Sequence, residues 1–507
     1  MNAHKLKSSN ILKVVNLTVL TAPFLFYGWF IHRNLIPVEY PDSYAYLWRQ
    51  PFNFYFLTGR SLTQRILFSL CFTRSDIIPY VQLLFYFSAA LIMYKFLSHS
   101  RSLLSQFFIS IIVALIFSSY TLNLSSVVIG PEPIFISMLI TFPLVLFSPH
   151  DKYSNIAVTA TGVFFIFSKN VAPYACISLL FFRMVTSKNY EIKRTLISTT
   201  LLLLISTVSI LVTMKYDTSI HINVVNIIYR EVFPYPEKVS YFNKEYEMPV
   251  GSLVEQCKGK WIGEPCSGMH FFWVDPKTRN LTLMEELPDI LRQSGITYQQ
   301  WVYLSKVLEN SKGFIRWVKT RGQRAWLHYL LFVSPERTYS IFKQKFLFIA
   351  EGRAIRFMTE YLGKEIPTNN PNNLVSIVGP NPKKEIGFGG FDSLTIILNI
   401  LLKLGFGYVE MIFLYIIGGI ILVHSVNFSS YLSYGTSMLA SSLILFFVCY
   451  FGDAIEIRRH VFPALIMLVF SGGIYLFSLI EIFFHQTGLR SIAVRALNRM
   501  SLRHIFQ

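Results

Sequence analysis

The sequence predicts a mostly α-helical membrane protein, with about ten helices crossing the bilayer and a large domain outside it. Of its 507 residues, 53% are hydrophobic and only 15% are charged, whereas soluble domains carry about a quarter charged residues. Several apolar runs approach the roughly 20 residues that a membrane-spanning helix needs. Two thirds of the net charge of +18 lies in the two terminal segments and in short loops on one side of those runs. This composition excludes a soluble, a disordered and a disulfide-stapled protein.

The apolar runs are the predicted spans, and they are residues 14–32, 77–97, 104–122, 133–148, 155–168, 171–186, 195–214, 406–425, 431–451 and 460–482. The first follows a basic flank and has no clear small-x-small cleavage site, so we interpret it as an uncleaved anchor. Pro143 and Pro173 make the ends of two short runs less certain. Residues 392–404 could form a span, a re-entrant piece or an interfacial helix.

The basic residues of the short loops set the predicted orientation. With the N-terminus in the cytoplasm, only Asp151 and Glu191 oppose the basic residues on that side. Those basic residues are Lys5, Lys7, Lys13, Lys95, Arg101, Lys152, Arg183, Lys188, Lys193, Arg194, Arg490, Arg495, Arg499 and Arg503. Both termini are therefore expected in the cytoplasm, with the protein in a bacterial inner (plasma) membrane. Because orientation explains most of the excess charge, we expect no nucleic-acid partner.

Four parts of the chain follow from this topology. Residues 1–214 form an N-terminal membrane module whose first outer loop is 33–76, and 215–391 form an outer, soluble-like (periplasmic or extracellular) domain between the seventh and eighth spans. Residues 392–484 hold the C-terminal membrane helices and 485–507 a basic cytoplasmic tail. Cys257 and Cys266 lie in the outer domain and could form a disulfide. The other cysteines, Cys71, Cys176 and Cys449, are expected in apolar cores.

Candidate functional residues gather at the outer ends of the spans. In the first outer loop Asp42 precedes Tyr44, Leu47 and Trp48, whose helical spacing favours an interfacial helix. Asp42 could simply cap that helix. Arg60, further along the same loop, could be a snorkelling interfacial residue.

Two further candidates come from the neighbouring outer turns. Glu132 lies between Pro131 and Pro133 at the start of the fourth span, where the helix dipole alone already favours an acid. Lys169 is a lone cation between two apolar runs, so it is either an ordinary loop residue or a site that attracts a phosphate.

The last candidates fill the turn between the two final spans. Asp453, Glu456, Arg458, Arg459 and His460 fall within eight residues, which is more polar than a passive hairpin needs. Arginine offers a planar fork that suits phosphate, and histidine takes either protonation state near neutral pH. We therefore favour a functional role here over a surface salt-bridge cluster.

Together these placements resemble the GT-C superfamily of polytopic glycosyltransferases, which use polyprenyl-phosphate-linked sugars. The resemblance rests on Asp42 before an interfacial helix and on the proline-flanked Glu132. In addition, the Asp453-x-x-Glu456-x-x-Arg459-His460 run is similar to a late motif of bacterial membrane proteins of this type. It covers residues 14–214 best, together with that late turn, and does not reach 215–391.

The resemblance implies an inverting glycosyltransferase with its active site on the outer face. Asp42 would be the general base on the acceptor hydroxyl and Glu132 a second acid in the same cavity. Arg60, Lys169 and Arg459 would hold the donor phosphate, with His460 assisting. The implied partners are membrane lipids, the polyprenyl-phosphate-sugar donor and a glycan, lipid or protein acceptor. No acid adjoins Asp42 to form a metal-binding pair, so no cofactor is expected with certainty and a divalent metal has no support.

Two alternatives stay open. One is an O-antigen-type polymerase or ligase, which would share the lipid-linked donor. The other is a non-enzymatic flippase or transporter of lipid-linked oligosaccharide, which should carry charge near the bilayer midplane. The sequence contains no zinc-ligand spacing, no phosphate-binding loop and no Gly-x-Ser-x-Gly elbow.

Overall fold

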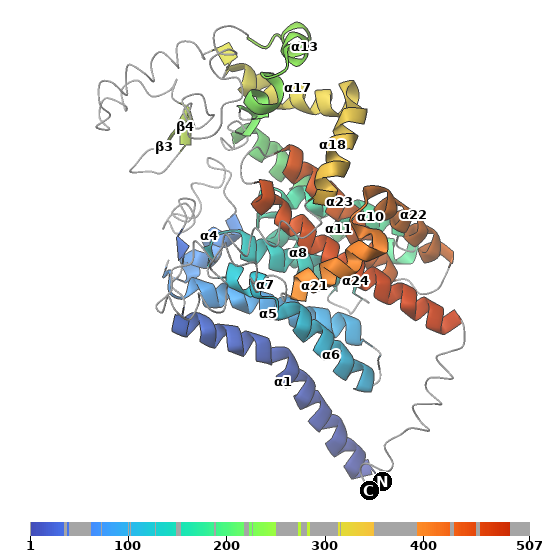
Figure 1. Ribbon diagram of the computed structural model, residues 1–507. Coiled ribbons are helices and arrows are strands. Elements are labelled where there is room, and N and C mark those ends of the chain that lie inside the picture. The colour runs from blue at the N-terminus through green and yellow to red at the C-terminus, as the bar shows by residue number, and fades with distance from the viewer. Residues whose placement is uncertain are drawn as a thin grey trace, which may run out of the picture.

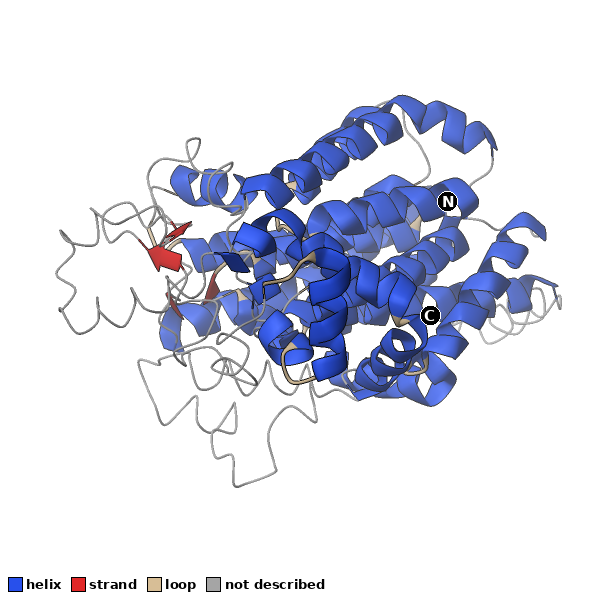
Figure 2. Cartoon of the chain, turned by 90° about the horizontal axis from the view of Figure 1, so that it is seen from above, coloured by secondary structure: helices blue, strands red, loops and turns tan. Residues whose placement is uncertain are grey.

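The protein is a bundle of apolar helices with a smaller group of helices at one end (Figure 1). The computed structural model describes residues 2–34, 38–39, 62–71, 74–99, 101, 103–126, 128–148, 154–186, 189–216, 223–225, 227–249, 272–274, 281–283, 313–314, 316–348, 393–425, 430–452 and 457–486. Viewed from above, helices make up nearly all of this part and strands are few and short (Figure 2). The chain is therefore mostly helical, as predicted.

The N-terminal half of the bundle contains a helix at the position of each of the first seven predicted apolar runs. They are α1 (Asn2–Asn34), α5 (Ile78–Ser98), α6 (Leu103–Phe117), α8 (Glu132–Phe147), α9 (Ser154–Ile166), α10 (Ala172–Thr186) and α11 (Asn189–Tyr216). Two short helices join them, α4 (Leu62–Leu70) and α7 (Tyr120–Ser125). The C-terminal half contains α21 (Ser393–Leu401), the π-helical turn η8 (Leu402–Phe406), α22 (Val409–Ser425), α23 (Ser430–Phe451) and α24 (Ile457–Gln486).

Among the described residues, five helices are long and apolar enough to cross a bilayer, namely Ile11–Arg33, Ile78–Ser98, Leu196–Met214, Tyr431–Phe451 and Val461–Phe483. A sixth candidate is the pair Ser393–Phe406 and Val409–His424, which is bent by 80° at its break. Four more apolar helices, α6, α8, α9 and α10, are shorter than a full span. These helices are compatible with a multi-pass membrane protein, while the count of ten spans stays a prediction.

Burial separates the centre of the bundle from its periphery. α23 is central, with 83% of its most apolar 18-residue stretch buried, whereas only 28% is buried in α11. Large apolar side chains of α11 and α22 face outward, among them Ile197, Leu204 and Leu414. Exposed apolar surface of this extent is costly in water and normal in contact with lipid.

Hydrogen bonds and ring contacts sort the helix ends into two sets. At one end, Thr63 of α4 contacts the end of α9, and Tyr27 of α1 donates to the Ser118 carbonyl after α6. At the opposite end, the ring of Phe147 in α8 contacts that of Tyr434 in α23. We name these the Lys169 end and the Arg101 end, after residues discussed below. They coincide with the two sides into which the basic loops sorted the chain, and which side faces the cytoplasm stays a prediction.

Described pieces of the 215–391 block form a helical cap at the Lys169 end. They comprise η1 (Ile228–Val232), α13 (Pro236–Tyr246), η4 (Val318–Gly322), α17 (Gln323–His328), η5 (Tyr329–Val333) and α18 (Pro335–Phe348). Strands β3 (Phe272–Val274) and β4 (Leu281–Leu283) pair antiparallel with Phe272 opposite Leu283. Buried aromatic residues such as Phe242 and Trp317 hold the cap together.

Several details differ from the sequence-based expectation. The predicted run 104–122 is interrupted, because α6 ends at Phe117 and α7 begins at Tyr120. Pro143 does not end its helix, since α8 continues to Phe147. Pro173 lies in the first turn of α10, where its missing N–H costs nothing. Within the open segment 392–404, the described residues 393–404 are helical and lie before the 80° bend.

The cysteines agree with the prediction where they are described. Cys176 and Cys449 are buried and Cys71 is partly buried, all as free thiols. Cys257 and Cys266 lie outside the described residues, as does the predicted interfacial helix after Asp42.

Candidate functional site

An ion pair lies nearly buried at the Lys169 end of the bundle. The Lys169 Nζ is 3.3 Å from the Glu132 Oε1, and the two side chains are only 10% and 9% exposed. The ammonium also lies over the Phe135 ring, 5.6 Å from its centroid, within the range of a cation–π interaction. The structure thus brings together two residues that the sequence named separately.

Local chain geometry places both charges. Glu132 is the first residue of α8, after the buried Gly130 and Pro131, and the helix dipole favours an acid there. Lys169 lies in the short turn between α9 and α10. The pair therefore links the start of α8 to the turn between α9 and α10.

The side chain of Gln64 in α4 links the same two connections. Its Nε2 donates to the Pro131 carbonyl at 3.1 Å and to the Ser168 carbonyl at 2.6 Å. These carbonyls directly precede Glu132 and Lys169 in the chain. Gln64 is fully buried, so its amide sets the distance between the two backbone segments that carry the ion pair.

Thr63 fastens α4 to the same place. Its backbone N–H donates to the Phe167 carbonyl at 3.2 Å, and its hydroxyl donates to the Phe164 carbonyl at 3.0 Å. Since α4 belongs to the segment 33–76, the predicted first outer loop, these bonds bring the end of that segment close to the ion pair.

A parallel strand pair brings the beginning of the first outer loop to the site. β1 (Val38–Glu39) pairs with β2 (Val128–Ile129), with Glu39 opposite Ile129. Ile129 precedes Glu132 by three residues, as Glu39 precedes Asp42. The register therefore aligns the two segments that lead to the two predicted catalytic acids.

Two polar side chains of α5 support the segment before β2. Gln82 Nε2 donates to the Ser126 carbonyl at 2.6 Å, and the Tyr86 hydroxyl is 2.8 Å from the Ser125 hydroxyl. Both side chains are fully buried. Buried polar groups of this kind are costly unless paired, so these contacts fix the approach to Glu132.

The remaining predicted residues are not part of this geometry. Asp42, Arg60, Asp453 and Glu456 lie outside the described residues. Arg458, Arg459 and His460 belong to the first turn of α24, described for the backbone alone. Within the described residues, no three His, Cys, Asp or Glu side chains converge as a metal site, and Asp42 is not covered by that observation.

The sequence-based reasoning overlooked Gln64 and Gln82. Both are amide side chains inside otherwise apolar stretches, and a polar amide in such a position needs a hydrogen-bond partner. That pattern is visible in the sequence, although it does not identify which backbone carbonyls accept.

Chemically, this arrangement offers a cation and a carboxylate, both nearly buried, at one end of the helix bundle. An ammonium has three donors, so Lys169 can contact Glu132 and still donate to an incoming anion. A carboxylate in such a place can accept a proton or a hydroxyl hydrogen bond.

Comparison with known proteins identifies no relatives: no family model, no characterised protein and no solved structure matches the chain.

Proposed function

We propose that the protein is an integral membrane glycosyltransferase that transfers a sugar from a polyprenyl-phosphate carrier to a glycan, lipid or protein acceptor. The observation that carries the proposal is the buried Glu132–Lys169 ion pair, fastened by Gln64 to the first outer loop. Burying a cation and an acid at a helix-bundle end is costly. A role in handling a charged, membrane-anchored substrate accounts for that cost.

The strand register supports Asp42 as the partner of Glu132. An extended chain advances at most about 3.6 Å per residue, so the covalent chain keeps the Cα of Asp42 within about 11 Å of that of Glu39. Arg60 precedes the first residue of α4, Leu62, by two positions. Both residues are therefore tethered to segments that contact the Glu132–Lys169 region.

In the proposed reaction, Asp42 accepts the proton of the acceptor hydroxyl as its oxygen attacks the anomeric carbon. The bond between that carbon and the phosphate oxygen breaks, and the carrier phosphate leaves with the electron pair. Lys169, Arg60 and Arg459 stabilise the growing negative charge on the phosphate. Glu132 orients Lys169 and lines the acceptor side, and His460 assists at the phosphate.

Two other functions fit a lipid-linked substrate. An O-antigen-type polymerase or ligase differs in its acceptor alone, and no described contact separates it from our proposal. A flippase requires charge along a path through the bilayer. The Glu132–Lys169 pair instead lies at one end of the bundle, which favours the enzyme.

The test compares lipid-linked intermediates and mature glycan in a deletion strain carrying the parent gene, Asp42→Asn or Glu132→Gln. Each variant is expected to accumulate donor on the outer face and to lower glycan output by about 100-fold, the usual cost of removing a catalytic group. Asp76→Asn is the matched control, because Asp76 is an exposed carboxylate of the same loop. Parent-like glycan from both variants would contradict the proposal, and donor retained on the cytoplasmic face would indicate a flippase.

A further inference from the structure

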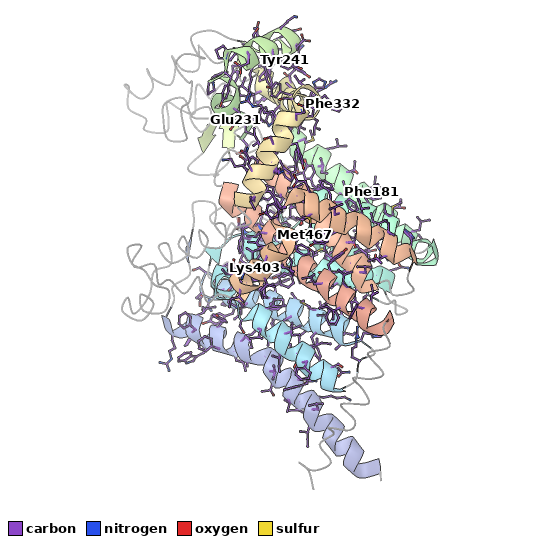
Figure 3. All side chains as sticks on the ribbon, turned by 45° about the vertical axis from the view of Figure 1, so that its right-hand side comes forward. Phe181, Glu231, Tyr241, Phe332, Lys403 and Met467 are labelled. Carbon is purple, nitrogen blue, oxygen red and sulfur yellow. The ribbon has the colours of Figure 1, made fainter. Side chains whose placement is uncertain are left out.

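We propose that the corner formed by α17, η5 and the start of α18 inserts into the lipid leaflet at the Lys169 end. Four large apolar side chains are exposed there: Leu327 is 40% exposed, Leu331 48%, Phe332 72% and Val333 41%. Figure 3 labels Phe332 in the cap, which also contains Glu231 and Tyr241. This surface belongs to a block that the sequence suggested was soluble-like, and the inference is independent of the proposed transferase activity.

The other face of the same segment is already packed. Trp317, Ala325, Trp326 and Leu330 are buried, and the Trp317 Nε1 donates to the Tyr246 carbonyl at 2.7 Å. The segment is therefore amphipathic, with one apolar face inside the cap and a second facing out. A second apolar face of this kind is typical of a helix that lies in a membrane interface.

Contacts with α22 and α23 fix the depth of the corner. The Trp326 Nε1 donates to the carbonyl of Phe451, the last residue of α23, at 3.1 Å. In α18, the rings of Phe342 and Phe346 both contact the Phe446 ring near the same helix end. These contacts hold the corner and α18 against the C-terminal part of α23, and Figure 1 shows α18 close to that helix.

The second half of α18 also contacts α22, through an ion pair. Lys343 Nζ lies 2.5 Å from the Glu410 Oε1 at the start of that helix. The neighbouring outward side chains Tyr408, Met411 and Leu414 are exposed and apolar or aromatic. The exposed apolar surface of the corner is thus at the level at which the lipid-facing surface of α22 begins.

Charge identifies the occupant as lipid with anionic headgroups. Residues 313–348 contain seven Lys and Arg against a single acid, Glu336, and every one of the seven is exposed. They are Arg316, Lys319, Arg321, Arg324, Arg337, Lys343 and Lys345. Arg321 and Lys343 are paired with Glu247 and Glu410, which leaves five of the seven outside those two ion pairs. Basic side chains around an apolar, aromatic-bearing surface add electrostatic attraction to anionic lipid headgroups to the burial of the apolar side chains.

Photo-cross-linking in the full-length protein tests the inference. Benzoylphenylalanine is placed at Phe332, at Leu414 as the lipid-facing control, or at Lys244, whose side chain is 83% exposed on α13. The protein is reconstituted in vesicles of equal parts phosphatidylcholine and phosphatidylglycerol, and phospholipid adducts are counted by mass spectrometry. We expect the adduct yield at 332 to lie within about threefold of that at 414 and about tenfold above that at 244.

Three results would overturn the inference. They are a yield at 332 equal to that at 244, adducts at 332 to another protein chain, and adducts at 332 to a second copy of this chain. A second measurement tests the charge argument with the double variant Arg324→Gln/Lys319→Gln. Adduct yield in the parent should rise about twofold when phosphatidylglycerol is added to pure phosphatidylcholine, and the variant should lose that increase. Equal yields in both vesicles for the parent would contradict the anionic-lipid part.

Discussion

Two buried ion pairs lie at opposite ends of the helix bundle, and they are built differently. At the Arg101 end, both terminal nitrogens of the Arg101 guanidinium contact the two Glu481 carboxylate oxygens, one of them at 2.7 Å. The guanidinium carbon is also 5.5 Å and 5.6 Å from the ring centroids of Tyr431 and Phe477. At the Lys169 end, one ammonium–carboxylate contact of 3.3 Å joins Lys169 to Glu132, and the ammonium lies 5.6 Å from the centroid of a single ring, Phe135.

The difference in geometry indicates a difference in rigidity, and we call the Arg101–Glu481 pair the clamp. A planar guanidinium that binds a carboxylate in two places and stacks on rings is fixed in one geometry. It ties the connection between α5 and α6 to the last helix. An ammonium on a flexible stem turns its donors with little cost, so the Lys169 contact can rearrange around an anion. We therefore expect the two pairs to serve different purposes despite their similar burial.

The largest expected effect is a loss of stability when the Arg101–Glu481 pair is broken. Glu481→Leu leaves the Arg101 cation without its partner in a region where that partner is only 12% exposed. We expect the free energy of unfolding to fall by about 3–5 kcal/mol, measured by thermal unfolding of the purified protein in detergent.

The double variant Arg101→Leu/Glu481→Leu sharpens this test. Removing both charges together leaves no unpaired ion, so most of the loss is expected to be recovered. If the double variant is as unstable as the single one, packing rather than charge explains the effect.

The second prediction concerns the Glu132–Lys169 pair. Glu132→Gln or Lys169→Met should lower the free energy of unfolding by about 2–3 kcal/mol, and the double variant should recover part of that loss. Glycan output should stay low in all three variants. Parent-like output in the double variant would show that this pair, like the clamp, serves stability alone.

The third prediction concerns Gln64. Gln64→Leu removes two hydrogen bonds to buried carbonyls and should lower stability by about 1–3 kcal/mol. It should also weaken the coupling between Glu132 and Lys169 in a double-mutant cycle. Gln82→Leu is the comparison variant: Gln82 is equally buried, but it donates to the Ser126 carbonyl on the Glu132 side alone and does not bridge the two segments, so we expect a smaller loss of coupling. An unchanged coupling in Gln64→Leu would contradict the positioning role.

The smallest effect on stability is expected from the exposed Arg74–Asp76 ion pair, with which the buried pairs can be compared. The hydrogen bond from Arg74 lowers the pKa of Asp76, although both side chains are about 60% exposed. A carboxyl with a lowered folded-state pKa contributes stability above its unfolded pKa, and that contribution is lost as the pH falls through the folded pKa. Because the pair is exposed, Asp76→Asn should leave the melting temperature at neutral pH unchanged within error. Any small difference from the parent should vanish in an acid titration, and a large neutral-pH loss would contradict the ranking by burial.

The sequence was sufficient for the helices that depend on apolar length alone. The central span Tyr431–Phe451 coincides with the predicted 431–451, because no competing structure satisfies so many apolar residues. The break after Phe117 was not predictable from hydropathy, since Tyr120–Ser125 continues as a separate helix. The 80° bend before Val409 was not predictable either, although Gly405 has a φ of +92° that only glycine adopts readily.

The candidate site was partly predictable, because the apolar spans also determine which loops lie at the same end of the bundle. Alternation of spans places Glu132 and Lys169 at one end of the bundle, yet it says nothing of their contact. That contact depends on Gln64, and the nine-residue α4 that carries it is too short to be recognised as a span. Asp42, Arg60 and the 453–460 turn stay predictions, because they lie outside the part of the chain whose side chains are described.

The clamp also has a consequence for the order of assembly. Glu132 and Lys169 are 37 residues apart, whereas Arg101 and Glu481 are 380 apart. A ribosome adds about 5–20 residues per second, so Lys169 is made within about ten seconds of Glu132, while Arg101 waits about 20–80 s for its partner. The N-terminal helices must therefore hold together in the membrane without this ion pair for most of synthesis. A chain that stops before α24 lacks Glu481, so Arg101 has no carboxylate partner and the shortened protein is expected to be less stable.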